Sequence, residues 1–139
     1  YRCYKDTQIT FFEVKFKNNK KRTIKERMRQ PCIEQEIKGA VSDFVRKNAS
    51  IDPDSLLPRL WVRYKRITLV NKNSQERLTI DLNLSYQDGE MNRSASFPHL
   101  VIAELKQDKS ADSFFATYMR NVRIHRVSIS KYFFGIYNV

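Results

Sequence analysis

Residues 76–85, Glu76-Arg77-Leu78-Thr79-Ile80-Asp81-Leu82-Asn83-Leu84-Ser85, contain the clearest strand pattern in the chain. From Arg77 to Ser85 every odd-numbered residue is polar, and from Leu78 to Leu84 every even-numbered residue is Leu or Ile. Since successive side chains of a strand point to opposite faces, this alternation predicts a strand with one polar and one apolar face.

Similar signals occur on both sides of this segment. In residues 9–17, Phe12, Val14 and Phe16 alternate with charged residues. Residues 60–70 are rich in aromatic and β-branched side chains. We expect strands at 9–17, 22–29, 60–70, 76–85, 99–106 and 127–137, separated by turns or loops at 18–21, 49–58, 71–75 and 86–98.

Two segments carry apolar residues at helical spacing. Pro31 opens a helix predicted to run to Asn48, with an apolar stripe that includes Ile37, Val41 and Phe44. A second helix is predicted at 111–122, capped by Ser110. Because most strands follow one another in hairpin order, the fold class expected is α+β with antiparallel strands.

Composition limits the function. The chain has 139 residues, 41% of them hydrophobic, which suits one domain. Its net charge of +11 indicates an anionic partner. Two cysteines make neither a disulfide framework nor a zinc motif. No stretch approaches the 18 apolar residues of a membrane span. None of the three glycines lies in a phosphate-binding loop motif, so a bound phosphate would be held by side chains.

Charged residues recur on one face of several expected strands, as with Glu13 and Lys15, or Glu104 and Lys106. Either this face meets solvent, or the sheet closes into a barrel with the charged face inside. The residue types suit phosphate, because Lys and Arg neutralise it and Arg grips it bidentately. Glu13 and Glu104 could hold Mg²⁺ or Mn²⁺.

Six motifs carry a family resemblance. Phe12-Glu13-Val14-Lys15 with Ile24-Lys25-Glu26-Arg27 resembles the E-x-K and K-x-R hairpin of the vacuolar transporter chaperone (VTC) domain. Tyr64-Lys65-Arg66, Arg77-Leu78-Thr79-Ile80-Asp81, Ile102-Ala103-Glu104-Leu105-Lys106 and Ser130-Lys131-Tyr132 resemble its later motifs, in the same order. Arg2 resembles the second Arg of the family's R-x-R strand.

The resemblance implies a triphosphate tunnel metalloenzyme: an antiparallel β-barrel or tunnel with flanking helices, without the family's first strands, forming one domain over 1–139. It implies a polyphosphate polymerase that transfers the terminal phosphoryl group of ATP to polyphosphate with Mn²⁺ or Mg²⁺. The expected phosphate-binding residues are Arg2, Lys15, Lys25, Arg27, Arg66, Arg77, Lys106 and Lys131. Of these, Lys15, Arg66, Arg77 and Lys131 would be catalytic, and Glu104 and Glu13 would hold the metal.

Other readings stay open. A triphosphatase of the same superfamily, or a non-catalytic sensor that binds polyphosphate or triphosphate, would use the same residues. A nucleic-acid binder is disfavoured because carboxylates alternate with the basic residues and stacking platforms are not evident. Asp81 is expected to orient Arg77 through a salt bridge. We expect a cytoplasmic location, with membrane contact only through a fused or partner subunit.

Overall fold

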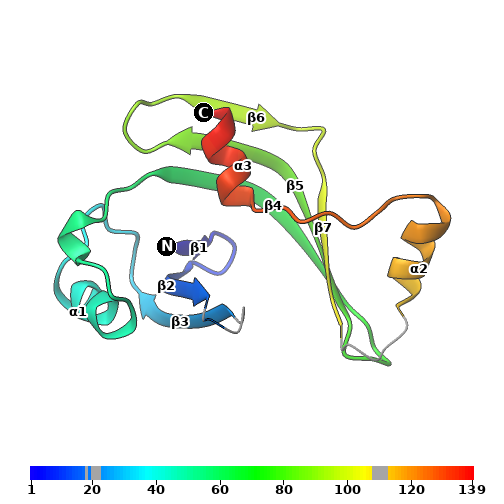
Figure 1. Ribbon diagram of the computed structural model, residues 1–139, viewed down its shortest axis with the longest axis horizontal. Coiled ribbons are helices and arrows are strands. Elements are labelled where there is room, and N and C mark those ends of the chain that lie inside the picture. Colours follow the sequence, from blue (N-terminus) through cyan, green and yellow to red (C-terminus); the bar gives the residue numbers. More distant parts are fainter. Residues whose placement is uncertain (18, 20–22, 108–112) are drawn as a thin grey trace. The chain divides into compact units, whose positions relative to one another are not determined.

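The computed structural model describes residues 1–17, 19, 23–107 and 113–139. The chain divides into two compact units, Tyr1–Pro58 and Arg59–Val139 (Figure 1). Both units contain antiparallel strands and α-helices, which confirms the α+β class.

The first unit is a three-stranded sheet with one helix. Strands β1 (Arg2–Tyr4), β2 (Ile9–Lys17) and β3 (Thr23–Gln30) pair in that order, and all pairs are antiparallel. Helix α1 (Gly39–Asn48) and a 3₁₀ turn, η1 (Pro53–Ser55), follow. Phe12 of β2 packs against Val41 and Val45 of α1, so the helix covers the apolar face that the alternation of 9–17 predicted.

The helix predicted from Pro31 is wrong in its first half. Residues 31–38 are irregular, and α1 begins only at Gly39. Gly39 has a φ of +53°, a left-handed backbone angle that suits glycine and that interrupts a right-handed helix. The apolar residues before it still pack, since Ile37 contacts the buried cluster of Phe12, Val41 and Val45.

The second unit is a four-stranded sheet with two helices. Its strands are β4 (Leu60–Val70), β5 (Arg77–Asp88), β6 (Ser94–Phe97) and β7 (Ile102–Lys106). Strand β5 is central: β4 pairs along one edge, and β6 and β7 pair with successive halves of the other edge, all antiparallel. The polar stretch predicted as a loop at 86–98 therefore contains the end of β5 and all of β6.

A β-bulge divides β5 into two halves. The register shifts between Arg63 and Lys65 of β4, and Asn83 has a φ of +53°. The extra residue exchanges the two faces of the strand after this point. The buried residues of β5 are accordingly Thr79 and Asp81 before the bulge but Leu84 and Tyr86 after it. The uninterrupted alternation predicted from Arg77 to Ser85 is thus wrong beyond Asn83.

The C-terminal segment predicted as a strand at 127–137 is instead helix α3 (Lys131–Asn138). Ser130 caps it, because its hydroxyl accepts a hydrogen bond from the Phe133 amide at 3.4 Å. Helix α3 lies against Leu84, Tyr86 and Leu60 through Phe134 and Val139. A Cβ at Gly135 would overlap the Tyr86 ring and lie 2.6 Å from Leu60 Cδ2, so glycine is what lets the helix approach the sheet this closely.

Helix α2 (Phe114–Asn121) is shorter than the helix predicted at 111–122. Its cap is Ser113, whose hydroxyl accepts a hydrogen bond from the Ala116 amide, whereas the expected cap Ser110 lies outside the described residues. Among the described helices, none has both the length and the hydropathy that crossing a membrane requires.

Candidate functional site

A cationic face covers one side of the first sheet. Residues directly opposite one another on paired strands share a face, and the register sets Arg2 opposite Phe11, Glu13 opposite Arg27 and Lys15 opposite Lys25. This side of the sheet is opposite to the one that packs on α1. It carries Arg2, Lys15, Lys25, Arg27 and Arg29.

Glu13 is the carboxylate at the centre of this face. Lys25 Nζ lies 2.6 Å from one carboxylate oxygen and Lys15 Nζ lies 3.1 Å from the other. Burial alone would raise the pKa of Glu13, but hydrogen bonds from Lys25 and Lys15 and the charge of Arg2 outweigh it and lower the pKa. Glu13 therefore stays ionised and aligns two lysines side by side.

Two further cations of this face, Arg27 and Arg29, are exposed. The Arg27 guanidinium lies over the Phe11 ring, 4.8 Å from its centroid, and Arg29 sits opposite Phe11 on the neighbouring strand. A guanidinium stacked on an aromatic ring keeps its outward N–H groups available for an anion.

In the second unit, Asp81 joins two predicted phosphate ligands from different elements. Arg66 of β4 contacts it bidentately, with Nε 2.6 Å from Oδ1 and Nη2 2.8 Å from Oδ2. Lys131, the first residue of α3, places Nζ 2.9 Å from Oδ2. The expectation that Asp81 orients Arg77 is therefore corrected: its ion-pair partners are Arg66, directly opposite it on β4, and Lys131, delivered by the helix.

Burial makes this cluster rigid. The Asp81 side chain is 1% exposed, while Arg66 and Lys131 keep 28% and 20% of their side-chain surface. Burial would raise the pKa of Asp81, but its hydrogen bonds with Arg66 and Lys131 prevail and lower the pKa. The same contact raises the pKa of Arg66, so both partners are charged at every physiological pH.

Tyr64 is a member of this cluster to which the sequence assigned no role. Its ring centroid lies 5.2 Å from the Arg66 guanidinium and 5.5 Å from Lys131 Nζ. Both cations thus contact one aromatic ring, which stabilises them by cation–π attraction. The only advance signal was the position of Tyr64 two residues before Arg66 on one strand, which sets both side chains on the same face.

Farther along the same face, strands β5 and β7 place more of the expected residues together. Arg77 is opposite Lys106, and Thr79 is opposite Glu104, so all four share the face of Asp81. Lys106 Nζ lies 3.6 Å from a Glu104 carboxylate oxygen. Glu104 and Lys106 keep 47% and 61% of their side-chain surface exposed, which leaves both accessible to a ligand.

The two carboxylates proposed as metal ligands differ in availability. Both oxygens of Glu13 already contact ammonium groups at 2.6 and 3.1 Å, an environment that suits a lysine clamp better than a cation site. Glu104 is half exposed and its described lysine neighbour, Lys106, is 3.6 Å away, which leaves its oxygens open to a hard divalent cation. In the described parts of the chain, no three His, Cys, Asp or Glu side chains gather to hold a metal by themselves.

Comparison with known proteins gives one match. A family model described as the VTC domain matches residues 1–139, the whole of the chain. No curated protein and no solved structure matches the sequence significantly.

Proposed function

The chain belongs to the VTC domain family, and from this premise we propose that it binds chains of phosphate and transfers the terminal phosphoryl group of ATP onto inorganic polyphosphate. The observation that carries the proposal is that Lys and Arg side chains lie on one face of each sheet. In each sheet, one carboxylate holds two of these cations in position. Glu13 aligns Lys15 with Lys25, and Asp81 aligns Arg66 with Lys131.

These two carboxylates leave each group of cations with a net positive charge. Glu13 is outnumbered by Lys15 and Lys25, and Asp81 by Arg66 and Lys131. A polyanion with one charge or more per phosphate would neutralise the excess. A fixed carboxylate therefore orients the cations in the empty protein without satisfying them, which suits repeated binding and release of an anion.

Phosphoryl transfer depends on positioning and on charge stabilisation at the phosphate oxygens. We assign these roles to Lys15, Arg66, Arg77 and Lys131, with Arg2, Lys25, Arg27 and Lys106 holding neighbouring phosphates. Arg66 uses Nε and one Nη on Asp81, which leaves its other Nη for a phosphate oxygen. When bound through Glu104, Mn²⁺ or Mg²⁺ would supply further positive charge between adjacent phosphates.

We further propose that the domain adopts the β-tunnel of the triphosphate tunnel metalloenzymes, with the charged faces of its strands inward. The support comes from each sheet separately. The first sheet buries its opposite face against α1, and the second concentrates its charged residues before the Asn83 bulge. A barrel with a charged interior requires this separation of charged residues from the apolar residues of the outer face.

The test is incubation of the full-length protein with ATP and Mn²⁺, followed by detection of polyphosphate on a gel. We expect polymer from the wild type, and a loss of at least about tenfold in Arg66→Lys, because lysine has no bidentate fork. The matched control is Arg63→Lys on the same strand, whose register with Ser85 puts it on the opposite face.

Two results would replace this proposal. Formation of ADP and inorganic phosphate without polymer would identify a triphosphatase built on the same residues. Stabilisation by tripolyphosphate without any turnover would identify a binding module. Retention of full activity in Arg66→Lys together with loss in Arg63→Lys would contradict the assignment of the faces.

A further inference from the structure

The surface formed by residues 114–129 combines exposed hydrophobic side chains with arginines. We infer that this segment, which comprises α2 and the chain after it, binds the surface of anionic lipid membranes. The inference is independent of the proposed phosphotransferase activity. It also departs from the expectation that membrane contact would belong only to a fused or partner subunit.

The hydrophobic part of the surface is large and open. Phe114 and Tyr118, one helical turn apart, are 84% and 52% exposed, and their rings stack with centroids 6.5 Å apart. After the helix, all residues from Val122 to Ser130 are exposed. They include the aliphatic side chains of Val122, Ile124, Val127 and Ile129. Leaving so many apolar groups in water is costly, so this concentration of exposed apolar side chains in one segment indicates a binding site.

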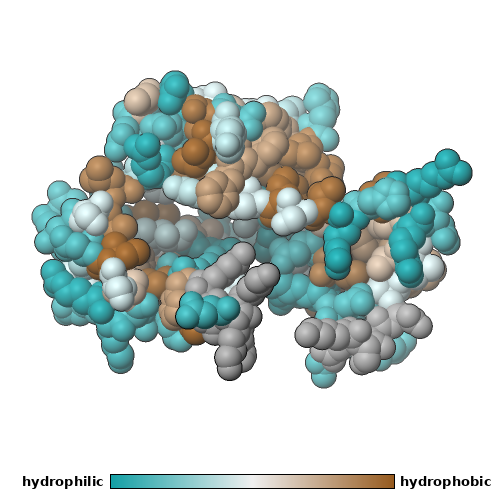
Figure 2. All heavy atoms as spheres, viewed as in Figure 1, coloured by the Kyte–Doolittle hydropathy of each residue, from teal (hydrophilic) through white to brown (hydrophobic). Residues whose placement is uncertain are grey.

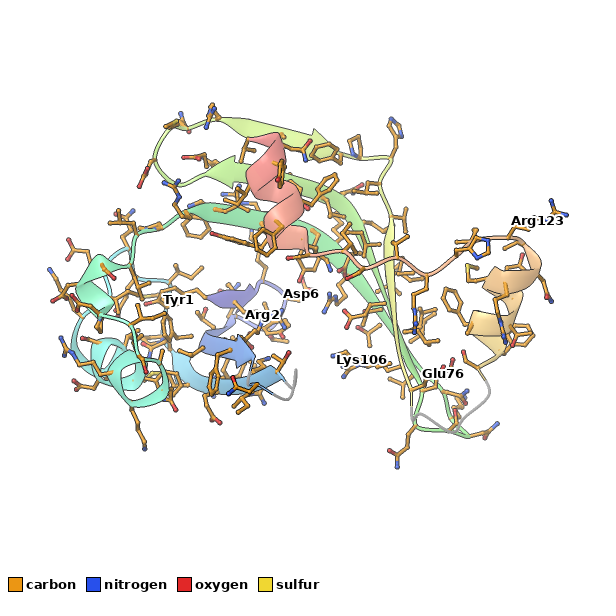
Figure 3. The ribbon with its side chains drawn as sticks, in the orientation of Figure 1. Tyr1, Arg2, Asp6, Glu76, Lys106 and Arg123 are labelled. Carbon is orange, nitrogen blue, oxygen red and sulfur yellow. The ribbon has the colours of Figure 1, made fainter. Side chains whose placement is uncertain are left out.

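Charge identifies the kind of partner. Arg120, Arg123 and Arg126 are exposed among these apolar residues, and Arg123 points away from the outer end of α2 (Figure 3). Figure 2 shows hydrophilic side chains interleaved with hydrophobic patches around α2. The sequence has no Asp or Glu from Ser113 to Val139. The partner must therefore offer an apolar phase together with negative charge.

An anionic bilayer offers an apolar phase and negative charge within a few ångströms of each other. Aromatic rings lie at the level of the headgroups, aliphatic side chains enter the acyl boundary, and arginines pair with lipid phosphates. A second copy of the chain fits less well, because a twofold contact would bring the three arginines against their own copies with no carboxylate in the segment. A single-stranded nucleic acid needs stacking platforms, whereas four of the six exposed apolar side chains here are aliphatic.

The experiment is co-sedimentation of the full-length protein with phosphatidylcholine vesicles, with and without phosphatidylserine. We expect binding only when phosphatidylserine is present. Phe114→Ser combined with Tyr118→Ser should weaken it by about tenfold. Each of Arg120→Gln, Arg123→Gln and Arg126→Gln should weaken it by about fivefold.

The controls remove similar side chains elsewhere on the second unit. Met91→Ser takes away an apolar group that is 65% exposed, and Lys72→Gln takes away an exposed cation; neither should alter vesicle binding. An unchanged melting temperature shows that each variant is folded, and the arginine variants test the inference if the aromatic pair fails to fold. Vesicle binding unaffected by all these changes overturns the inference. So does a loss, in the same variants, of oligonucleotide binding or of self-association in place of vesicle binding.

Discussion

Asp81 and Arg66 lie directly opposite one another on strands β5 and β4, and the guanidinium contacts the carboxylate through two hydrogen bonds of 2.6 and 2.8 Å. Lys131 adds a third contact at 2.9 Å from a helix far along the sequence. One buried carboxylate therefore joins two strands and the start of α3, and it fixes the positions of two proposed phosphate ligands.

The first prediction concerns removal of this carboxylate charge. Asp81→Asn leaves Arg66 and Lys131 next to each other without a counter-ion, in a partly buried place. We expect the free energy of unfolding to fall by about 3 kcal/mol, measured by urea denaturation at pH 7. Tripolyphosphate should then stabilise the variant more than the wild type, because the anion replaces the missing charge. Equal stability of the two proteins would show that Asp81 does not organise the cluster.

The second prediction is the pH dependence of that difference. The pKa of Asp81 is lowered in the folded protein, so its contribution to stability is present above the pKa of an unfolded aspartate, about 3.9. The contribution is lost as the pH falls through the lower, folded pKa. Unfolding free energies of wild type and Asp81→Asn should therefore differ at pH 7 and at pH 5, and converge once the pH falls below the folded pKa of Asp81. A constant difference over this range would contradict the cause given for the shift.

The third prediction concerns the contact that delivers Lys131. In Gly135→Ala the new methyl group would overlap the Tyr86 ring, so α3 has to move away from the sheet. We expect a lower melting temperature and an overpacking cost of about 1–3 kcal/mol. Affinity for tripolyphosphate should also fall, because Lys131 moves with the helix. Gly39→Ala is the comparison: its Cβ would meet nothing within 4 Å, so it strains only the backbone angle of +53°. If Gly135→Ala is destabilised but its affinity for tripolyphosphate is unchanged, the position of α3 does not affect phosphate binding.

The fourth prediction compares two lysines of the first unit. Lys25 lies on the cationic face at 2.6 Å from Glu13, whereas Lys47 is exposed on α1, which covers the opposite face. Lys25→Gln should weaken tripolyphosphate binding by about tenfold in isothermal titration calorimetry, as expected for loss of one charged contact. Lys47→Gln removes the same charge and should have little effect. Equal losses in both variants would mean that net charge alone attracts the anion.

Local patterns predicted the strands well and the pairing of the charged residues poorly. Strands at 9–17 and 60–70 match β2 and β4, because their alternation and β-formers act over neighbouring residues. The alternation of 76–85 gave no sign of the bulge at Asn83, since a bulge depends on how a strand pairs with its neighbour and not on the pattern of one strand alone. The error mattered, because it placed Leu84 on the wrong face.

The end of the chain shows the same limit. Aromatic and β-branched residues at 127–137 favour a strand, yet α3 forms because the Ser130 cap and packing on Tyr86 outweigh that propensity. Family resemblance named Lys131, but the sequence did not predict its contact with Asp81, because the two residues are fifty positions apart and no local rule joins them.

The central claim is that phosphate chains bind to the cations of both sheets, and a crystal structure of the full-length protein with tripolyphosphate and Mn²⁺ tests it most directly. We predict phosphate oxygens within about 2.7–3.2 Å of Arg66 and Lys131 in one unit and of Lys25 in the other, with Mn²⁺ at Glu104. Tripolyphosphate bound elsewhere, with these four side chains surrounded only by solvent, would contradict the account.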